Sequence, residues 1–158
     1  MKSGAKYDYI AYTDGGYIIP KGIGASACVI LDAHTRKELY WWSKVCENST
    51  SNRQELGAII HTILSIPCFG KVLIYSDSQY AIGVLSGKMR GKLNKDLIEY
   101  FWGFCEQRRI SVDFKWVQGH NGNHYNEVVD SLCTEAMAWY RETGERVRES
   151  FNLALNPE

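Results

Sequence analysis

The sequence has no excess of either charge, because its 18 lysines and arginines balance 18 aspartates and glutamates. The balance gives no support to general nucleic-acid binding, which usually rests on a basic excess. No apolar run reaches the length of a membrane span, and the N-terminus lacks the apolar core of a signal peptide. We therefore expect a cytoplasmic protein with no membrane partner.

Cysteine is scarce and scattered, with five residues and no CxxC pair, which favours reduced, buried thiols over disulfides or a zinc knuckle. The sequence also lacks a GxSxG motif and a Cys-His signature, so a nucleophilic serine or cysteine enzyme is not indicated. His120 and His124 have the spacing of two zinc ligands on a helix. The intervening NGN, however, lacks a glutamate base, and its glycine breaks the helix, so zinc is not expected.

The hydrophobic pattern predicts an α/β fold. An alternating aromatic run predicts a first strand at Tyr7–Thr13 that ends in the turn Asp14-Gly15-Gly16. Further strands are predicted at Gly24–Leu31, Glu38–Val45, Lys71–Tyr75 and Ser111–Val117, and helices at Ser51–Ser65, from the cap Ser78 to Leu85, at Asp96–Arg108, and from His124 or Tyr125 to Tyr140. This order predicts a five-stranded mixed sheet flanked by helices, with residues 1–143 as one domain and 144–158 as a tail.

Four acids have positions that would bring them together. Asp14 ends the first predicted strand and Asp77 follows the KVLIYS strand, so both lie at strand ends where α/β sheets bind ligands. Glu55 and Asp130 lie in early turns of their helices and can project toward the same edge. Four such carboxylates repel one another unless they are protonated or bridged by cations. Two magnesium ions, with oxygen ligands, are the natural solution, and Mn²⁺ is possible.

The motifs YTDGG, SNRQELGAI, YSDSQYAI and WVQGHNGNHYNEVVDSL occur in the order found in the ribonuclease H type 1 family, and the chain resembles that family from Tyr7 to Ala138. The resemblance implies an RNase H-like fold and an endonuclease that hydrolyses the RNA strand of RNA–DNA hybrids, leaving 5′-phosphate and 3′-hydroxyl ends. It implies that Asp14 bridges two ions, that Asp130 holds the ion that activates water, and that Glu55 and Asp77 hold the other. His120 matches the mobile histidine that assists turnover.

The resemblance also implies a set of substrate contacts. Asn52 and Gln79 match residues that reach the minor groove of the hybrid, and Thr50 and Asn94 match a pocket for a phosphate of the DNA strand. The remaining positions in the expected substrate-binding set are Gly15, Tyr17, Ser51 and Asn126. Discrimination between RNA and DNA requires the 2′-hydroxyl, which suits serine, asparagine, glutamine and main-chain amides.

The sequence departs from some family members in its basic region. A long basic helix and loop is replaced here by GKMRGKLNK, at residues 87–95. We expect weaker, salt-sensitive binding of the hybrid and a free-standing monomer. Other readings are a catalytically inactive binding module, which the four acids oppose, and a domain of a reverse transcriptase, transposase or integrase.

Overall fold

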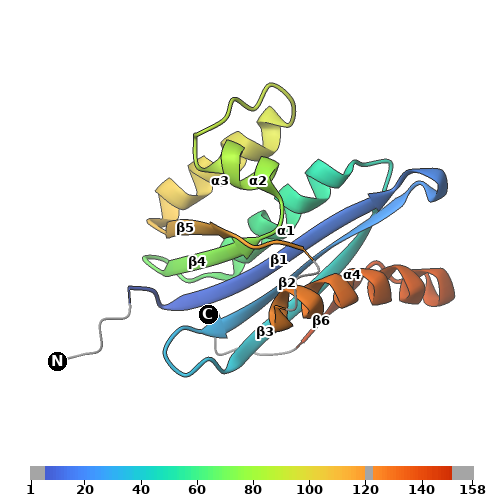
Figure 1. Ribbon diagram of the computed structural model, residues 1–158, viewed down its shortest axis with the longest axis horizontal. Coiled ribbons are helices and arrows are strands. Elements are labelled where there is room, and N and C mark those ends of the chain that lie inside the picture. The colour runs from blue at the N-terminus through green and yellow to red at the C-terminus, as the bar shows by residue number, and fades with distance from the viewer. Residues whose placement is uncertain (1–5, 120–122, 151–158) are drawn as a thin grey trace.

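The computed structural model describes residues 6–119 and 123–150 and contains one mixed sheet with helices on both faces (Figure 1). Its strand order is β5-β4-β1-β2-β3-β6, with β4 and β5 parallel to β1 and the others joined by antiparallel pairing. The strands are β1 (Tyr9–Ile18), β2 (Ile23–Asp32), β3 (Glu38–Glu47), β4 (Lys71–Ser76), β5 (Ser111–Trp116) and β6 (Val147–Glu149). The predicted fold class is confirmed, with one strand more than the sequence indicated.

The helices divide between the two faces of the sheet. They are α1 (Ser51–Ser65), α2 (Gln79–Leu85), α3 (Lys95–Arg108) and α4 (His124–Thr143), together with a short 3-10 turn η1 (Ile19–Lys21). One apolar core joins α1, α2 and α3 to the sheet, and a second joins α4 to β1, β2 and β3 on the opposite face. No helix in the described part of the chain is long and apolar enough to cross a membrane.

The first strand is longer than predicted. Asp14 does not end β1 but pairs with Ala27 of β2, and the strand continues to Ile18. The turn lies further along, where Pro20 is the second residue of η1 and Gly22 adopts a left-handed conformation with φ of 65°. Pairing with β4 nevertheless stops at Tyr12, so Asp14 still lies at the carboxyl edge of the parallel strands.

The segment after α4 contributes the strand that the sequence did not reveal. The helix ends at Gly144, as expected from its left-handed φ of 80°, and β6 then pairs with β3. The Arg148 guanidinium lies 5.2 Å from the Trp139 ring centre and 5.8 Å from that of Trp41. Trp42, on the same strand as Trp41, is buried, so a tryptophan of this strand faces the core.

Candidate active site

Three of the predicted acids meet at the carboxyl edge of β1 and β4. Asp14 lies on β1, Asp77 follows β4 directly, and Glu55 lies in the second turn of α1. One carboxylate oxygen from each lies within 4.8 Å of the other two. Asp14 is only 8% exposed and Glu55 only 9%, so the cluster is largely removed from water.

Asp130 lies beside this cluster, not within the group of three. It is half-buried on α4, and it raises the pKa of Asp14 both through its charge and through a side-chain hydrogen bond. The start of α4 is fixed by Asn123, whose side-chain oxygen accepts a hydrogen bond from the Asn126 amide at 3.0 Å. All four acids predicted from the sequence therefore share one site.

The electrostatics of the cluster favour a bound cation. Burial, followed by the charges of Asp77 and Asp130, raises the pKa of Asp14 to about 8. Burial and the charges of Asp14 and Asp77 raise the pKa of Glu55 to about 10. The Oε1 atom of Glu55 is also buried without a hydrogen-bond partner in the described part of the chain. Hard divalent cations suit these oxygen ligands, since they would compensate both the repulsion and the missing contact.

Gly15 allows helix α1, which carries Glu55, to pack closely on strand β1. A Cβ atom on Gly15 would lie 2.4 Å from the carbonyl carbon of Gln54 and 2.5 Å from the amide nitrogen of Glu55. The buried Ser26 hydroxyl holds the same turn, because it donates to the Gln54 carbonyl at 2.7 Å. The main chain of α1 therefore rests directly on β1, next to Asp14.

Asp77 is positioned by two residues that the sequence did not single out. The Trp116 indole N–H donates to the Asp77 carbonyl oxygen at 3.2 Å. A Cβ atom on Gly119 would lie 2.9 Å from Asp77 Oδ2, so this backbone approaches the carboxylate closely. Gly119, within the motif WVQGHNGNHYNEVVDSL, was a sequence signal for such a close approach, whereas nothing in the sequence indicated the role of Trp116.

A second polar cluster joins the starts of α1 and α3. The predicted phosphate-pocket residues Thr50 and Asn94 both contact Arg53. The Thr50 hydroxyl accepts a hydrogen bond from the Arg53 main-chain amide at 3.1 Å. The Asn94 side-chain oxygen accepts one from the Arg53 guanidinium at 3.1 Å. Arg53 also pairs with Asp96 at 2.9 Å, and Asn94 donates to the Tyr80 hydroxyl at 3.0 Å. The sequence did not lead us to single out Arg53, although this residue lies inside the motif SNRQELGAI.

The other predicted contact residues lie in several settings. Ser51, Asn52 and Gln79 are exposed on the first turns of α1 and α2, Tyr17 is half-buried on β1, and Asn126 is buried on α4. His120 lies outside the described residues. His124 is the first residue of α4, with its ring edge-on to Tyr125 at 4.7 Å, in keeping with its interpretation as a helix-start residue.

The comparisons with known proteins agree with this arrangement. The RNase H family model matches residues 6–138. Ribonuclease H of Anaeromyxobacter dehalogenans strain 2CP-C is 32% identical over 155 residues, covering 87% of this chain and 84% of the relative. Ribonuclease H of Wolbachia pipientis wMel is 31% identical over 144 residues, covering 84% of this chain and 97% of the relative.

Two solved structures share the fold at lower sequence identity. LC11-RNase H1 in complex with an RNA/DNA hybrid has a TM-score of 0.74 and 22% identity, covering 84% of this chain and 99% of that one. The N-terminal RNase H domain of a Mycobacterium tuberculosis protein has a TM-score of 0.71 and 18% identity, covering 89% and 100%. The chain therefore belongs to the RNase H family, which confirms the family and the nuclease class predicted from its motifs.

Proposed function

We propose that this protein is an endonuclease that hydrolyses the RNA strand of RNA–DNA hybrids with two divalent metal ions. The observation that carries the proposal is the buried meeting of Asp14, Glu55 and Asp77, with their oxygens within 4.8 Å of one another. Relatives named Ribonuclease H support the activity, and a structural neighbour solved with an RNA/DNA hybrid supports the substrate.

Each of the four acids has a proposed role in holding the ions. Asp14, at the centre, is the proposed bridge; Glu55 and Asp77 hold one side of the site, and Asp130 holds the other. Bound Mg²⁺, or Mn²⁺ in its place, supplies Lewis-acid activation of the attacking water and stabilises the leaving oxygen, giving 5′-phosphate and 3′-hydroxyl ends. Burial of Asp14 and Glu55 keeps these two carboxylates in place before substrate arrives, while Asp77 and Asp130 are half-buried beside them. His120 is the proposed aid to turnover.

Substrate is positioned by the surface around the cluster. Thr50 and Asn94, joined through Arg53, form the proposed site for a DNA-strand phosphate. The exposed side chains at the starts of α1 and α2 are suited to the minor groove, where the RNA 2′-hydroxyls lie. The proposed contacts are Gly15, Tyr17, Ser51, Asn52, Gln79 and Asn126. Because the basic loop 87–95 is short but still carries lysine and arginine, we expect hybrid binding that is weaker and still sensitive to salt.

Several broader proposals accompany this function. Five free cysteines fit a reducing, cytoplasmic setting, and the proposed active form is a monomer. The catalytic domain is proposed to span residues 1–143, with 144–158 as a C-terminal segment. Mg²⁺ is the proposed physiological ion.

A cleavage assay tests the function. The protein is incubated with labelled RNA–DNA hybrid, duplex RNA, duplex DNA and single-stranded RNA, with Mg²⁺, with Mn²⁺ or with EDTA. We expect cleavage of the RNA strand of the hybrid only, lost in EDTA and in Asp14→Asn. Glu142→Gln, on the exposed end of α4, removes a distant carboxylate as a matched control and should leave cleavage unchanged. Cleavage that survives Asp14→Asn, or hybrid binding without any cleavage, contradicts the proposal.

A further inference from the structure

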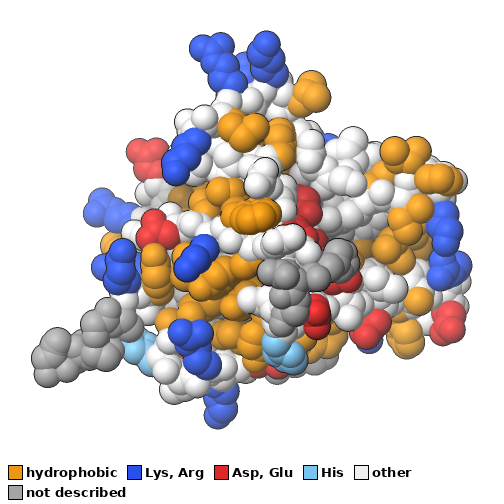
Figure 2. Space-filling view, in the orientation of Figure 1, with side chains coloured by type: hydrophobic (Ala, Val, Ile, Leu, Met, Phe, Trp, Pro, Cys, Tyr) orange, Lys and Arg blue, Asp and Glu red, His pale blue; other side chains and the backbone are white. Residues whose placement is uncertain are grey.

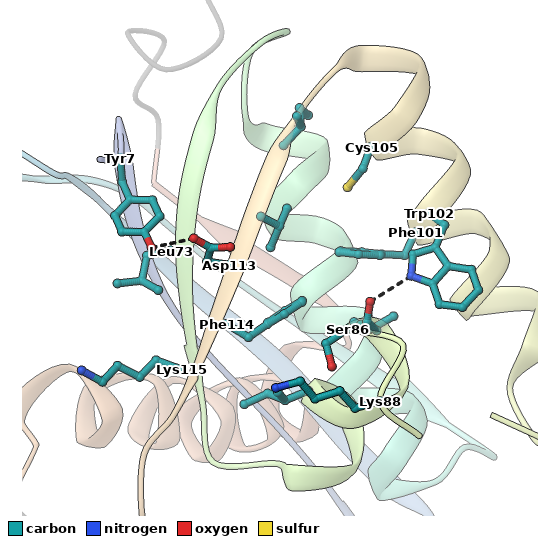
Figure 3. A pocket seen from close by; sticks show the side chains of 14 residues that line it. Tyr7, Leu73, Ser86, Lys88, Phe101, Trp102, Cys105, Asp113, Phe114 and Lys115 are labelled. Carbon is teal, nitrogen blue, oxygen red and sulfur yellow. Dashed lines mark hydrogen bonds between the residues drawn. The ribbon is translucent and has the colours of Figure 1, made fainter. Parts of the chain in front are cut away.

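A groove of about 830 Å³ runs along β5, the edge strand of the sheet (Figure 3). In the described part of the chain β5 pairs only with β4, so its other side lacks a neighbouring strand. Among the described residues, the lining includes none of the four acids or of the predicted substrate contacts, but it does include Lys88 of the basic loop 87–95. It includes Leu73, Leu85, Phe101, Trp102, Phe114 and Lys115.

The groove wraps around the strand and uses both of its faces. On the side of α2 and α3, Phe114 packs against Phe101 with ring centres 6.0 Å apart, and Trp102 is 46% exposed beside them. On the opposite side, Asp113 and Lys115 point away from these helices, and the Tyr7 hydroxyl donates to Asp113 at 2.7 Å (Figure 3). The face toward the helices is therefore mainly apolar, with Ser86 and Lys88 at one end, and the other face is mainly polar, with Leu73 beside Asp113.

This shape fits an extended peptide better than a compact molecule. The backbone of β5 separates the two faces, so a compact ligand could fill only one of them. A peptide that pairs with the free edge of β5 would send alternate side chains to either face and would satisfy the unpaired main-chain groups of the edge. Strand addition is thus the mode of binding that uses the whole groove.

The charges around the polar face select the peptide. Lys115 lies on this face, and Lys6 and Lys71 line an adjoining hollow with Tyr7 and Asp113. Figure 2 shows lysine and arginine side chains around the apolar surface of this side of the molecule. Asp113 is the one acid among the described residues that line the two hollows, and it accepts a hydrogen bond from the Tyr7 hydroxyl, which partly compensates its charge. An acidic side chain on the partner would therefore be attracted to this face.

We propose that the β5 edge docks an extended segment of another protein whose side chains alternate between apolar and acidic residues. The apolar side chains face α2 and α3, and the acidic ones face Lys71 and Lys115. The partner adds a strand to the sheet beside β5, on the opposite edge from β6. This surface lies apart from the four acids, and Lys88 of the basic loop 87–95 lines one end of it.

The test measures fluorescence anisotropy of a labelled peptide of about ten residues in which valine and glutamate alternate. We expect saturable binding that Lys71→Glu with Lys115→Glu weakens by about tenfold or more, since two attractive charges become repulsive. Lys37→Glu with Lys44→Glu makes the same charge change on exposed positions outside the groove and should leave binding unchanged. Two further peptides, with serine replacing valine or lysine replacing glutamate, should not bind.

Hydrogen exchange locates the contact. The bound peptide should slow exchange of amides in β5 and leave those of β6 unaffected. Absence of binding, equal loss in both double variants, or protection elsewhere overturns the proposal. Displacement of the peptide by RNA–DNA hybrid would assign the surface to nucleic acid, and a dimer of this chain that loses β5 protection on dilution would assign it to self-association; either result also overturns it.

Discussion

The Trp116 indole N–H donates a hydrogen bond to the main-chain carbonyl of Asp77, and this contact links the end of β5 to the acid that follows β4. The side chain is 46% exposed, so burial does not account for its position. Trp102 offers a close parallel, since it is also 46% exposed and donates to the Leu85 carbonyl at 2.9 Å. The two residues differ in that only Trp116 touches the site.

Trp116→Phe keeps an aromatic ring but removes the donor, so Asp77 should be held less firmly. We expect Mg²⁺ affinity to fall about fivefold, which corresponds to the ~1 kcal/mol typical of one hydrogen bond. Isothermal titration with Mg²⁺ measures this directly. Trp102→Phe should lower the free energy of unfolding by a similar amount and leave Mg²⁺ affinity unchanged. An equal effect of the two variants on Mg²⁺ affinity would contradict a positioning role for Trp116.

Metal-free protein should lose stability as the pH rises. The pKa of Asp14 is about 8 and that of Glu55 about 10 in the folded state, above their ordinary values of 3.8 and 4.5. The folded state therefore retains protons that the unfolded chain has released, and this contribution to stability is lost as pH rises through the folded-state pKa values. His61, whose pKa burial lowers to about 4, acts in the opposite direction below its ordinary value of 6.5.

The window from about pH 7.5 to 8.5 isolates the carboxylates from His61, because by pH 7.5 this histidine is almost entirely neutral in both states. We expect the free energy of unfolding in EDTA to fall by about 2 kcal/mol across this window, measured by urea denaturation. Asp14→Asn should flatten the slope, and saturating Mg²⁺ should restore stability to the unsubstituted protein. If the free energy of unfolding of the metal-free protein instead rises with pH in this window, repulsion among the carboxylates does not destabilise the folded state.

Gly15→Ala should disturb both stability and the site. The new methyl group would meet the main chain of α1, which cannot rotate away as a side chain can, so the helix must shift relative to β1. We expect a loss of about 1–3 kcal/mol in the free energy of unfolding and weaker binding of Mg²⁺, because Glu55 moves with the helix. Gly16→Ala is the matched control, since its Cβ atom meets nothing within 4 Å.

Chemical denaturation and Mg²⁺ titration of both variants check this prediction. Equal losses in Gly15→Ala and Gly16→Ala would mean that strand propensity explains the effect. A stability loss in Gly15→Ala with unchanged Mg²⁺ affinity would mean that the contact does not set the position of Glu55.

Much of the fold and the meeting of the acids could be predicted because both depend on local patterns. Helix α1 has the bounds expected from the period of its apolar residues, and the position of the acids follows from the rule that strand ends share one edge. The predicted end of β1 was wrong, because Asp14-Gly15-Gly16 has the composition of a turn but belongs to the strand. Gly15 instead allows close packing against α1, and the turn lies at Pro20 and Gly22.

The features that sequence reasoning missed depend on contacts between distant segments. The partner of Arg53, Asp96, lies 43 residues away, and the bond from Trp116 spans 39 residues. Strand β6 has only three residues, too few for an alternating pattern, and its Arg148 depends on aromatic rings from β3 and α4. No local propensity encodes such partners.

Arg148→Ala should loosen β6. The substitution removes the cation–π contacts with Trp41 and Trp139 and the 4.0 Å ion pair with Glu135, so we expect a loss of about 1 kcal/mol. Hydrogen exchange at the β3–β6 pairing should speed up while β1 stays protected. Arg141→Ala, at an exposed position on α4, removes the same side chain as a control. Equal exchange at β6 in both variants would show that Arg148 does not hold the strand.

The four acids stand on separate elements between residues 14 and 130, and this spacing has a kinetic consequence. An ion-binding cluster exists only when the parallel strands, α1 and α4 have all assembled, so it belongs to the last stage of folding. Divalent ions should therefore stabilise the native state without stabilising the barrier that precedes it. In stopped-flow measurements, Mg²⁺ should slow unfolding and leave the refolding rate unchanged, so that the ion lengthens the lifetime of the folded protein without guiding the chain toward it.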